Sequence, residues 1–298
     1  MPLPALATRL LRTLTLPAAA DGRPAHVSAA SGAVLHADRL CVIADDELAL
    51  GRFALQDGDG PDEWLPLLPG ALPEAYAARK AAKPDLEALL ALPDGRLLAL
   101  GSGSRPQRQR GVLLTGDVPR ELDLAPLYAP LHAEFGALNL EGGFITAGRI
   151  TLLQRASRGA PRNACIHFDA AALTRWLDGA GPVPRPVGVQ LLNLGTLHGV
   201  PLGLTDGCAL AEGGFLFSAA AEDSPDTVAD GVVTGSVIGQ VGADGAIASL
   251  RVLDRPCKVE GLAAQPAVNG ALPLLLVTDA DDRAAPAWLL TADWPLGP

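Results

Sequence analysis

The chain has 298 residues, of which 49% are hydrophobic and 19% are charged, a composition typical of a folded globular protein rather than a disordered one. Its formal net charge of −10 argues against the basic surface that binding to nucleic acid or anionic lipid requires. No apolar run approaches the ~18 residues of a membrane-spanning helix. Neither nucleic acid nor a membrane is therefore an expected partner.

The N-terminal segment and the cysteines indicate where the protein resides. Residues 1–20 are mildly apolar, but Arg9 and Arg12 interrupt what would be the hydrophobic region of a secretion signal. The cysteines lie far apart and show neither CxxC nor zinc-type spacing, which favours reduced thiols. They are Cys41, Cys165, Cys208 and Cys257. We therefore expect a cytoplasmic protein.

The chain contains an internal repeat of hairpin-like segments. Each segment consists of two short apolar runs joined by a tight turn of Asp and Gly type, the strongest local signal for a β-hairpin. In chain order the segments span residues 31–46, 85–102, 139–154, 205–218 and 258–278. Equivalent positions recur every 54 to 65 residues, a period closer to that of propeller blades than to that of helical solenoids.

Further apolar runs complete the repeating units. In the second unit residues 111–115 and 120–128 follow the hairpin, and in the fourth unit residues 232–241 and 246–253 do so. Four strands per unit make the blade of a β-propeller. The last unit stops soon after a third strand at residues 287–292. The N-terminal run at residues 8–16 can supply its missing fourth strand and so close the ring.

These elements predict an all-β, single-domain β-propeller over residues 1–298, with five four-stranded blades. Helical patterns are limited to short turns at residues 75–82 and 170–177. A six-bladed ring is the alternative, if the long stretch between Glu141 and Asp206, or the termini, contain a degenerate blade.

The first strand of each repeat begins with the same kind of residue. This column consists of Ser31, Glu87, Glu141, Asp206 and Glu260. First strands surround the central channel of a propeller, so we expect the column to ring one mouth of that channel. Converging carboxylates need a cation or basic partners, and clustered oxygen ligands suit calcium. The alternative interpretation is structural, with each acid accepting hydrogen bonds from backbone amides of the neighbouring blade.

The loops between second and third strands reach the same mouth and carry many charges. One sector is rich in arginine, at residues 102–110 and 155–162, and Lys80 and Lys83 lie on the same rim. Arginine binds phosphate or carboxylate oxygens in bidentate fashion. An acidic sector comprises residues 45–47, 222–224 and 279–283. The alternative is that these charges are no more than solvated turn residues.

Three short motifs at the starts of the hairpins carry a family resemblance. Asp85-Leu86-Glu87, Asn139-Leu140-Glu141 and Val259-Glu260-Gly261 resemble the phytase-like and esterase-like bacterial β-propeller families. In phytase propellers, channel acids hold calcium ions while lysines and arginines bind substrate phosphates. The resemblance implies that Glu87, Glu141, Asp206 and Glu260 are metal ligands. It implies that Arg105, Arg155, Arg158 and Lys258 bind the anion.

Taken together, the sequence predicts a charged axial pocket that binds a small anionic ligand, a divalent cation such as calcium, or both. Lys83 joins the ligand-binding residues because it lies on the same rim. The alternative is a calcium-dependent phosphoester hydrolase of the phytase-like kind, with Glu87 and Glu141 as the catalytic pair that activates water. Binding of a protein partner at the same mouth is a further alternative. Glycoside hydrolysis ranks last, because only 12 aromatic residues are available as sugar platforms.

Overall fold

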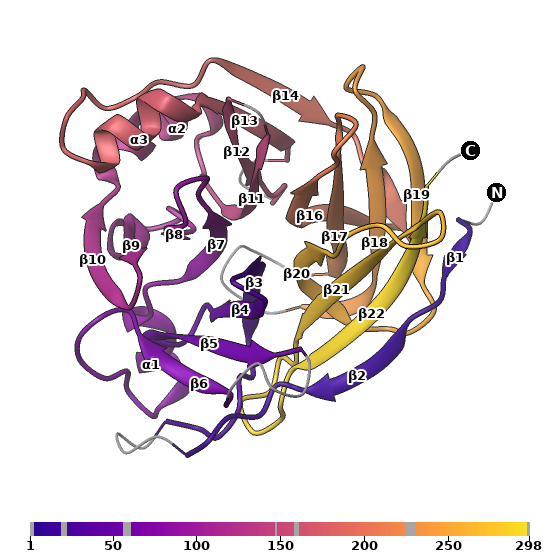
Figure 1. The fold of residues 1–298 in the computed structure, drawn as a ribbon, viewed down its shortest axis with the longest axis horizontal. Helices are drawn as coiled ribbons and strands as arrows, with labels where there is room; N and C mark the ends of the chain where they lie inside the picture. Colours follow the sequence, from indigo (N-terminus) through magenta and orange to yellow (C-terminus); the bar gives the residue numbers. More distant parts are fainter. Residues whose placement is uncertain are drawn as a thin grey trace.

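The computed structural model describes residues 3–18, 23–55, 61–146, 148–157, 161–223 and 231–296. Five sheets stand around a common centre like the blades of a fan (Figure 1). In the first three sheets the strand that comes first in the chain lies innermost, and later strands follow outward (Figure 1). The predicted five-bladed β-propeller is confirmed, and the six-bladed alternative is wrong.

The first three blades follow the chain without interruption. The first consists of β3 (Ala30–His36), β4 (Arg39–Ala44), β5 (Ala49–Ala54) and β6 (Glu63–Pro66). The second consists of β7 (Leu86–Ala91), β8 (Leu97–Gly101), β9 (Arg110–Thr115) and β10 (Val118–Asp123). The third consists of β11 (Leu140–Thr146), β12 (Arg149–Gln154), β13 (Asn163–Asp169) and β14 (Gly188–Leu192).

The last two blades include strands from the N-terminal segment. The fourth is built on β16 (Val200–Ala209), β17 (Phe215–Asp223), β18 (Val232–Val241) and β19 (Ile247–Leu253), with β15 (Thr196–Leu197) and β1 (Ala5–Leu6) at its edges. The fifth consists of β20 (Lys258–Ala264), β21 (Ala271–Asp279), β22 (Trp288–Pro295) and β2 (Arg9–Thr13).

The N-terminal strand closes the ring, as predicted. β2 pairs antiparallel with β22, and Leu10 lies opposite Leu290. Just beyond the strand, the backbone N–H of Leu14 donates a 2.8 Å hydrogen bond to the carbonyl of Ala287. The Leu14 side chain is fully buried between the first and last blades. The N-terminal strand β2 and the last strand of the chain, β22, therefore lie side by side in one sheet (Figure 1).

Three α-helices interrupt the strands within the described residues. α1 (Tyr76–Ala82) and α3 (Ala170–Leu177) match the two short helical turns that the sequence indicates. The predicted strand at residues 120–128 is wrong in its second half, since β10 ends at Asp123 and α2 (Ala125–Phe135) follows. Proline in the first turn suits a helix start. No helix among the described residues is long and apolar enough to cross a membrane.

Apolar side chains fill the spaces between neighbouring blades. The largest such cluster joins the second and third blades, where α2 and α3 add side chains to those of the strands. The α2 residues in this cluster are Leu127, Tyr128, Leu131 and Phe135. Cys41 and Cys165 are buried in the sheets, and all four cysteines are free thiols. Sheet-to-sheet packing holds the innermost strands in a fixed ring, and these strands build the site.

Candidate functional site

Each innermost strand contains one residue that the pairing with its neighbour skips. The skipped residues are Ser31, Glu87, Glu141, Thr205 and Glu260. Such a β-bulge re-aims the side chain of the extra residue. Four of the five positions agree with the acidic column expected from the sequence. In the fourth blade the position belongs to Thr205, so the expected alignment of Asp206 is wrong by one residue.

Asp206 joins neighbouring blades through hydrogen bonds from backbone N–H groups. Its side chain is buried, and its Oδ2 accepts a 2.9 Å hydrogen bond from the N–H of Leu262. Its Oδ1 accepts from the N–H groups of Gly207 (2.8 Å) and Gly143 (3.4 Å). Burial raises the pKa of Asp206 well above its usual value, while these donors oppose that shift. The alternative interpretation of the column, in which an acid accepts hydrogen bonds from backbone amides of the neighbouring blade, therefore describes Asp206.

An axial cavity of about 560 Å³ lies at the end of the ring where innermost strands begin. Among the described residues, eight carboxylate and five basic side chains line it, which leaves a formal excess of three negative charges. The chain has only three lysines, and all of them line this cavity. They are Lys80, Lys83 and Lys258. A residue type that is rare in the chain is therefore concentrated at one place.

On one wall of the cavity, Arg155 binds carboxylates from three blades. Its Nη1 lies 3.1 Å from Glu141 Oε2 and 3.3 Å from Glu260 Oε1, and its Nη2 lies 2.8 Å from Glu222 Oε2. The side chain crosses to these partners over Gly203, where an added Cβ would lie 2.9 Å from Arg155 Cγ. The close approach explains why a glycine stands in the middle of β16.

Lys258 reinforces the same wall. Its Nζ lies 3.3 Å from Glu260 Oε1 and 3.1 Å from Asp279 Oδ2. Burial alone would lower the pKa of Lys258, but these carboxylates raise it well above its usual value. We call this wall the Arg155 cluster, which comprises Arg155, Lys258, Glu141, Glu222, Glu260 and Asp279. Both of its cations are already paired with carboxylates.

The opposite wall is built around Lys83, which caps the C-terminal end of α1. Its Nζ contacts Asp45 Oδ2 and lies 2.9 Å from Asp85 Oδ1. Asp85 also pairs with Arg108, whose Nη1 lies 2.7 Å from its Oδ2. Burial alone would lower the pKa of Lys83, but Asp45 and Asp85 raise it above its usual value. We call this wall the Lys83 cluster, which comprises Lys83, Asp45, Asp85, Glu87 and Arg108.

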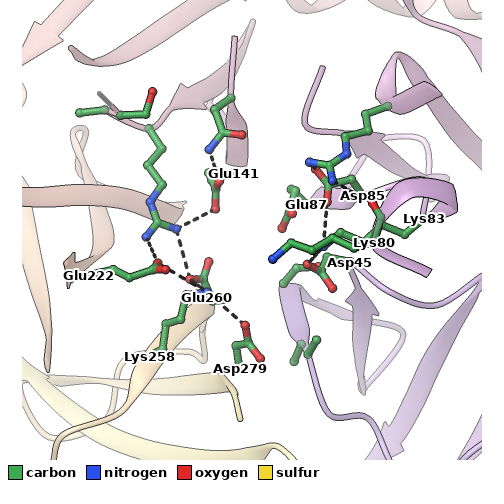
Figure 2. Close-up of a pocket in the computed structure, with 18 of the residues that line it drawn as sticks. Asp45, Lys80, Lys83, Asp85, Glu87, Glu141, Glu222, Lys258, Glu260 and Asp279 are labelled. Atoms are coloured by element: carbon green, nitrogen blue, oxygen red, sulfur yellow. Dashed lines mark hydrogen bonds and ion pairs between the residues drawn. The ribbon is translucent and has the colours of Figure 1, made fainter. Parts of the chain in front are cut away.

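Glu87 is the member of the Lys83 cluster that has no partner. Its exposed fraction is 8%, and it makes no hydrogen bond or ion pair with any described residue. Burial raises its pKa well above the usual value, and the charges of Glu141, Asp85 and Asp45 add to the shift. Asp45, Asp85 and Glu87 each contribute one carboxylate oxygen to a group of three oxygens that all lie within 4.8 Å of one another. Figure 2 shows the labelled residues of the two clusters facing each other across the cavity.

The structure brings most of the predicted site residues to this cavity. Its lining includes the predicted catalytic pair, Glu260, and three of the predicted ligand-binding residues, Lys83, Arg155 and Lys258. Asp206 and Arg105 are not part of the lining. Arg105 instead begins the short helix η1 (Pro106–Arg108), and Arg108 at its end reaches the cavity. Arg158 lies outside the described residues.

Sequence reasoning missed Asp85 and Arg108 as site residues. Asp85 stands two residues before Glu87, and its φ of 57° lies in the left-handed region, just before β7 begins. This turn lets Asp85 and Glu87 both reach the cavity. Arg108 was inside an arginine-rich loop, but nothing in the pattern separates it from Arg105. Asp45 was expected on the rim and proves to be a central member of the Lys83 cluster.

The fold and the site define a five-bladed β-propeller with a charged axial cavity. The chain belongs to the family of unknown function DUF6929, whose profile matches residues 26–293. No curated protein matches the chain. Among solved structures, the glutaminyl cyclase of Myxococcus xanthus is 13% identical, with 98% of this chain and 99% of that chain covered and a TM-score of 0.51.

Two further likenesses are to bacterial enzymes. A gluconolactonase from Xanthomonas campestris is 9% identical, with 90% of this chain and 87% of that chain covered and a TM-score of 0.48. A PQQ-bound aldose sugar dehydrogenase from Streptomyces coelicolor is 14% identical, with 98% of this chain and 100% of that chain covered and a TM-score of 0.42. The predicted resemblance is confirmed for the β-propeller fold alone. Its phytase-like and esterase-like part stays a prediction.

Proposed function

We propose that the axial cavity binds a divalent cation through Asp45, Asp85 and Glu87, and with it a small oxyanion. The observation that carries the proposal is Glu87, a buried carboxylate that lines the cavity beside two more carboxylates and has no hydrogen-bond or ion-pair partner among the described residues. A buried charge of this kind is costly unless a counter-ion neutralises it. Hard oxygen ligands select calcium, magnesium or manganese over softer metals.

The cation helps to explain how an anion could enter an acidic cavity. Arg155 and Lys258 are the basic groups opposite the metal ligands, and both are already paired with carboxylates. A free anion would meet a formal excess of negative charge in the lining. A bound divalent cation offsets two of the three excess negative charges and offers coordination positions to the oxygens of a phosphate or carboxylate.

Metal binding is tested by thermal unfolding and calorimetry with calcium, magnesium and manganese. Saturating metal should raise the melting temperature of the wild type by about 5 °C, from the linkage of binding to folding. Glu87→Gln should lose most of this increase. Glu134→Gln, which changes an exposed glutamate on α2, should retain it. No increase with any of the three ions, or an undiminished increase in Glu87→Gln, would overturn the proposal.

The anion is tested with phenyl phosphate in the presence and absence of the bound metal. The proposal predicts that phenyl phosphate binds only when the metal is present, and that Arg155→Met weakens this binding. Equal binding without metal would contradict the role given to the cation. Binding that Arg155→Met leaves unchanged would remove the Arg155 cluster from the anion site.

A calcium-dependent phosphoester hydrolase is the second candidate function. It is favoured by the charge interaction between Glu87 and Glu141 across the cavity and by the raised pKa of Glu87. A carboxyl group with a raised pKa holds its proton more strongly than a free carboxyl group, which suits general acid–base catalysis. Release of phenol from phenyl phosphate by the metal-loaded wild type, with loss in both Glu87→Gln and Glu141→Gln, would support it. Absence of turnover with every metal that binds would exclude it for this ester.

A further inference from the structure

The two basic side chains that reach Asp85 play different parts in the cavity. Arg108 binds Asp85 from a fixed position, because its Nη1 also bonds Ser104 Oγ at 3.0 Å and its residue is buried at the end of η1. Lys83 reaches Asp85 and Asp45 with the tip of a flexible four-carbon chain. Lysine offers a compact point charge rather than a rigid fork. Of the two, Lys83 is the cation that can move.

Lys83 occupies the place that a metal ion would need. Its Nζ contacts Asp45 and Asp85, and these two supply two of the three oxygens that lie within 4.8 Å of one another. A divalent cation on the same oxygens would stand at direct contact distance from the ammonium. Two positive charges at such a distance repel strongly in a poorly hydrated cavity. The ammonium and the metal therefore exclude each other.

The backbone of Lys83 is fixed, whereas its side chain borders a second cavity into which it can move. The Lys83 N–H donates a 2.8 Å hydrogen bond to the carbonyl of Arg79, and Arg79 is anchored by Asp46 and Glu47. Lys83 also borders a second cavity of about 410 Å³, whose lining includes Asp46 and Asp279. An ammonium that leaves Asp45 and Asp85 can turn towards these acids without unfolding α1.

We propose that the Lys83 ammonium is the resident cation of the Asp45–Asp85–Glu87 site and that a divalent cation binds by displacing it. The inference rests on the proposed metal site and adds the residue that sets its affinity. Lys83 neutralises part of the negative charge while the metal is absent, so the site stays folded without metal. The same contact lowers metal affinity, because the ion must break two ion pairs before it binds.

Calcium affinity is measured by titration calorimetry in the wild type, Lys83→Met and Arg185→Met. Lys83→Met should bind calcium about tenfold or more tightly than the wild type, which corresponds to about 1.4 kcal/mol of binding free energy. Arg185→Met removes one positive charge from an exposed loop position and should change the affinity by less than about twofold. Equal or weaker binding by Lys83→Met would overturn the inference.

A second measurement on the wild type does not depend on how Lys83→Met folds. Because the chain has three lysines, an amine-reactive reagent followed by peptide mass analysis reports each one separately. Calcium should increase the modification of Lys83 several-fold and leave that of Lys258 unchanged. Unchanged or decreased modification of Lys83 in the calcium-bound protein would overturn the displacement.

The outcomes separate this inference from the function on which it rests. If Lys83→Met binds calcium and the wild type does not at about 1 mM, the weak end of protein calcium sites, displacement stands and the proposed function of the wild type falls. If both bind equally, the metal site stands and the role of Lys83 falls. If neither binds calcium, magnesium or manganese, both proposals fall.

Discussion

The Oδ2 atom of Asp206 accepts a 2.9 Å hydrogen bond from the backbone N–H of Leu262, and this buried contact joins the fourth blade to the fifth. Asp206→Asn keeps the shape of the side chain but replaces one acceptor oxygen by an NH₂ donor. At least one buried backbone N–H is then unsatisfied. We expect a loss of about 3 kcal/mol in the free energy of unfolding, measured by urea denaturation.

Asp244→Asn is the matched control for this variant. Asp244 lies in an exposed turn, where its Oδ1 accepts a 3.0 Å hydrogen bond from the N–H of Ala246. Solvent can replace that contact, so the change should stay within about 0.5 kcal/mol. Similar losses in the two variants would show that the buried contacts of Asp206 carry no special share of the stability.

Gly142 leaves room for the fourth blade to approach the third. An added Cβ would lie 2.6 Å from both the Asp206 Cα and the Thr205 carbonyl oxygen, which are atoms that cannot move aside. Gly142→Ala should therefore destabilise the protein by about 2 kcal/mol or more. Gly188→Ala changes a glycine in the outermost strand of the same blade, where the nearest atom is 3.7 Å away. Denaturation curves in which Gly188→Ala is the more damaging change would contradict this account.

The blade number was predictable because it depends on local patterns. Apolar runs joined by turns of Asp and Gly type repeat in the blades. The N-terminal run at residues 8–16 belongs to no repeat, so the open edge of the last blade was the place where it could pair. The predicted strand that became α2 shows the limit of this reasoning. Leu127, Leu131 and Phe135 have helical spacing, but they follow strand-forming residues without a clear break in hydrophobicity.

The site was predictable only in part, because side-chain direction depends on single-residue shifts. An acid at position 206 looks like the column residue of its repeat, yet the bulge in β16 falls on Thr205 and turns Asp206 away from the cavity. The choice between Arg105 and Arg108 depends on one short turn of helix. Ion pairs between blades, such as that of Arg155 with Glu260, join residues 105 positions apart and leave no local pattern.

The closing strand can be tested with two leucines of the same segment. Leu14 is fully buried against the first and last blades, whereas the exposed fraction of Leu11 is 39%. Leu14→Ala should lower the free energy of unfolding by about 2–5 kcal/mol through lost burial and a new cavity. Leu11→Ala should cost less than about 1 kcal/mol. Equal losses in thermal denaturation would mean that the segment adds little to the closed ring.

Removing the cation that joins three blades should give a pH-dependent loss of stability. Arg155→Met leaves Glu141, Glu222 and Glu260 without the guanidinium that pairs with all three, and we expect a loss of about 3–5 kcal/mol at pH 8. Burial raises the pKa of Glu260 to about 8, against the lowering effect of Lys258 and Arg155. Without Arg155 that pKa rises further above its value in the unfolded chain.

A carboxyl group whose pKa is raised by folding stabilises the protein below its unfolded pKa, and this contribution is lost as the pH rises through the folded pKa. The loss caused by Arg155→Met should therefore be smaller at pH 5 than at pH 8, where the uncompensated carboxylates are more fully ionised. Urea denaturation at both pH values measures it. Arg149→Met, which changes an exposed arginine at the start of β12, should show a small loss at either pH. A loss for Arg155→Met that is equal at the two pH values, or larger at pH 5, would mean that packing rather than charge holds this side chain in place.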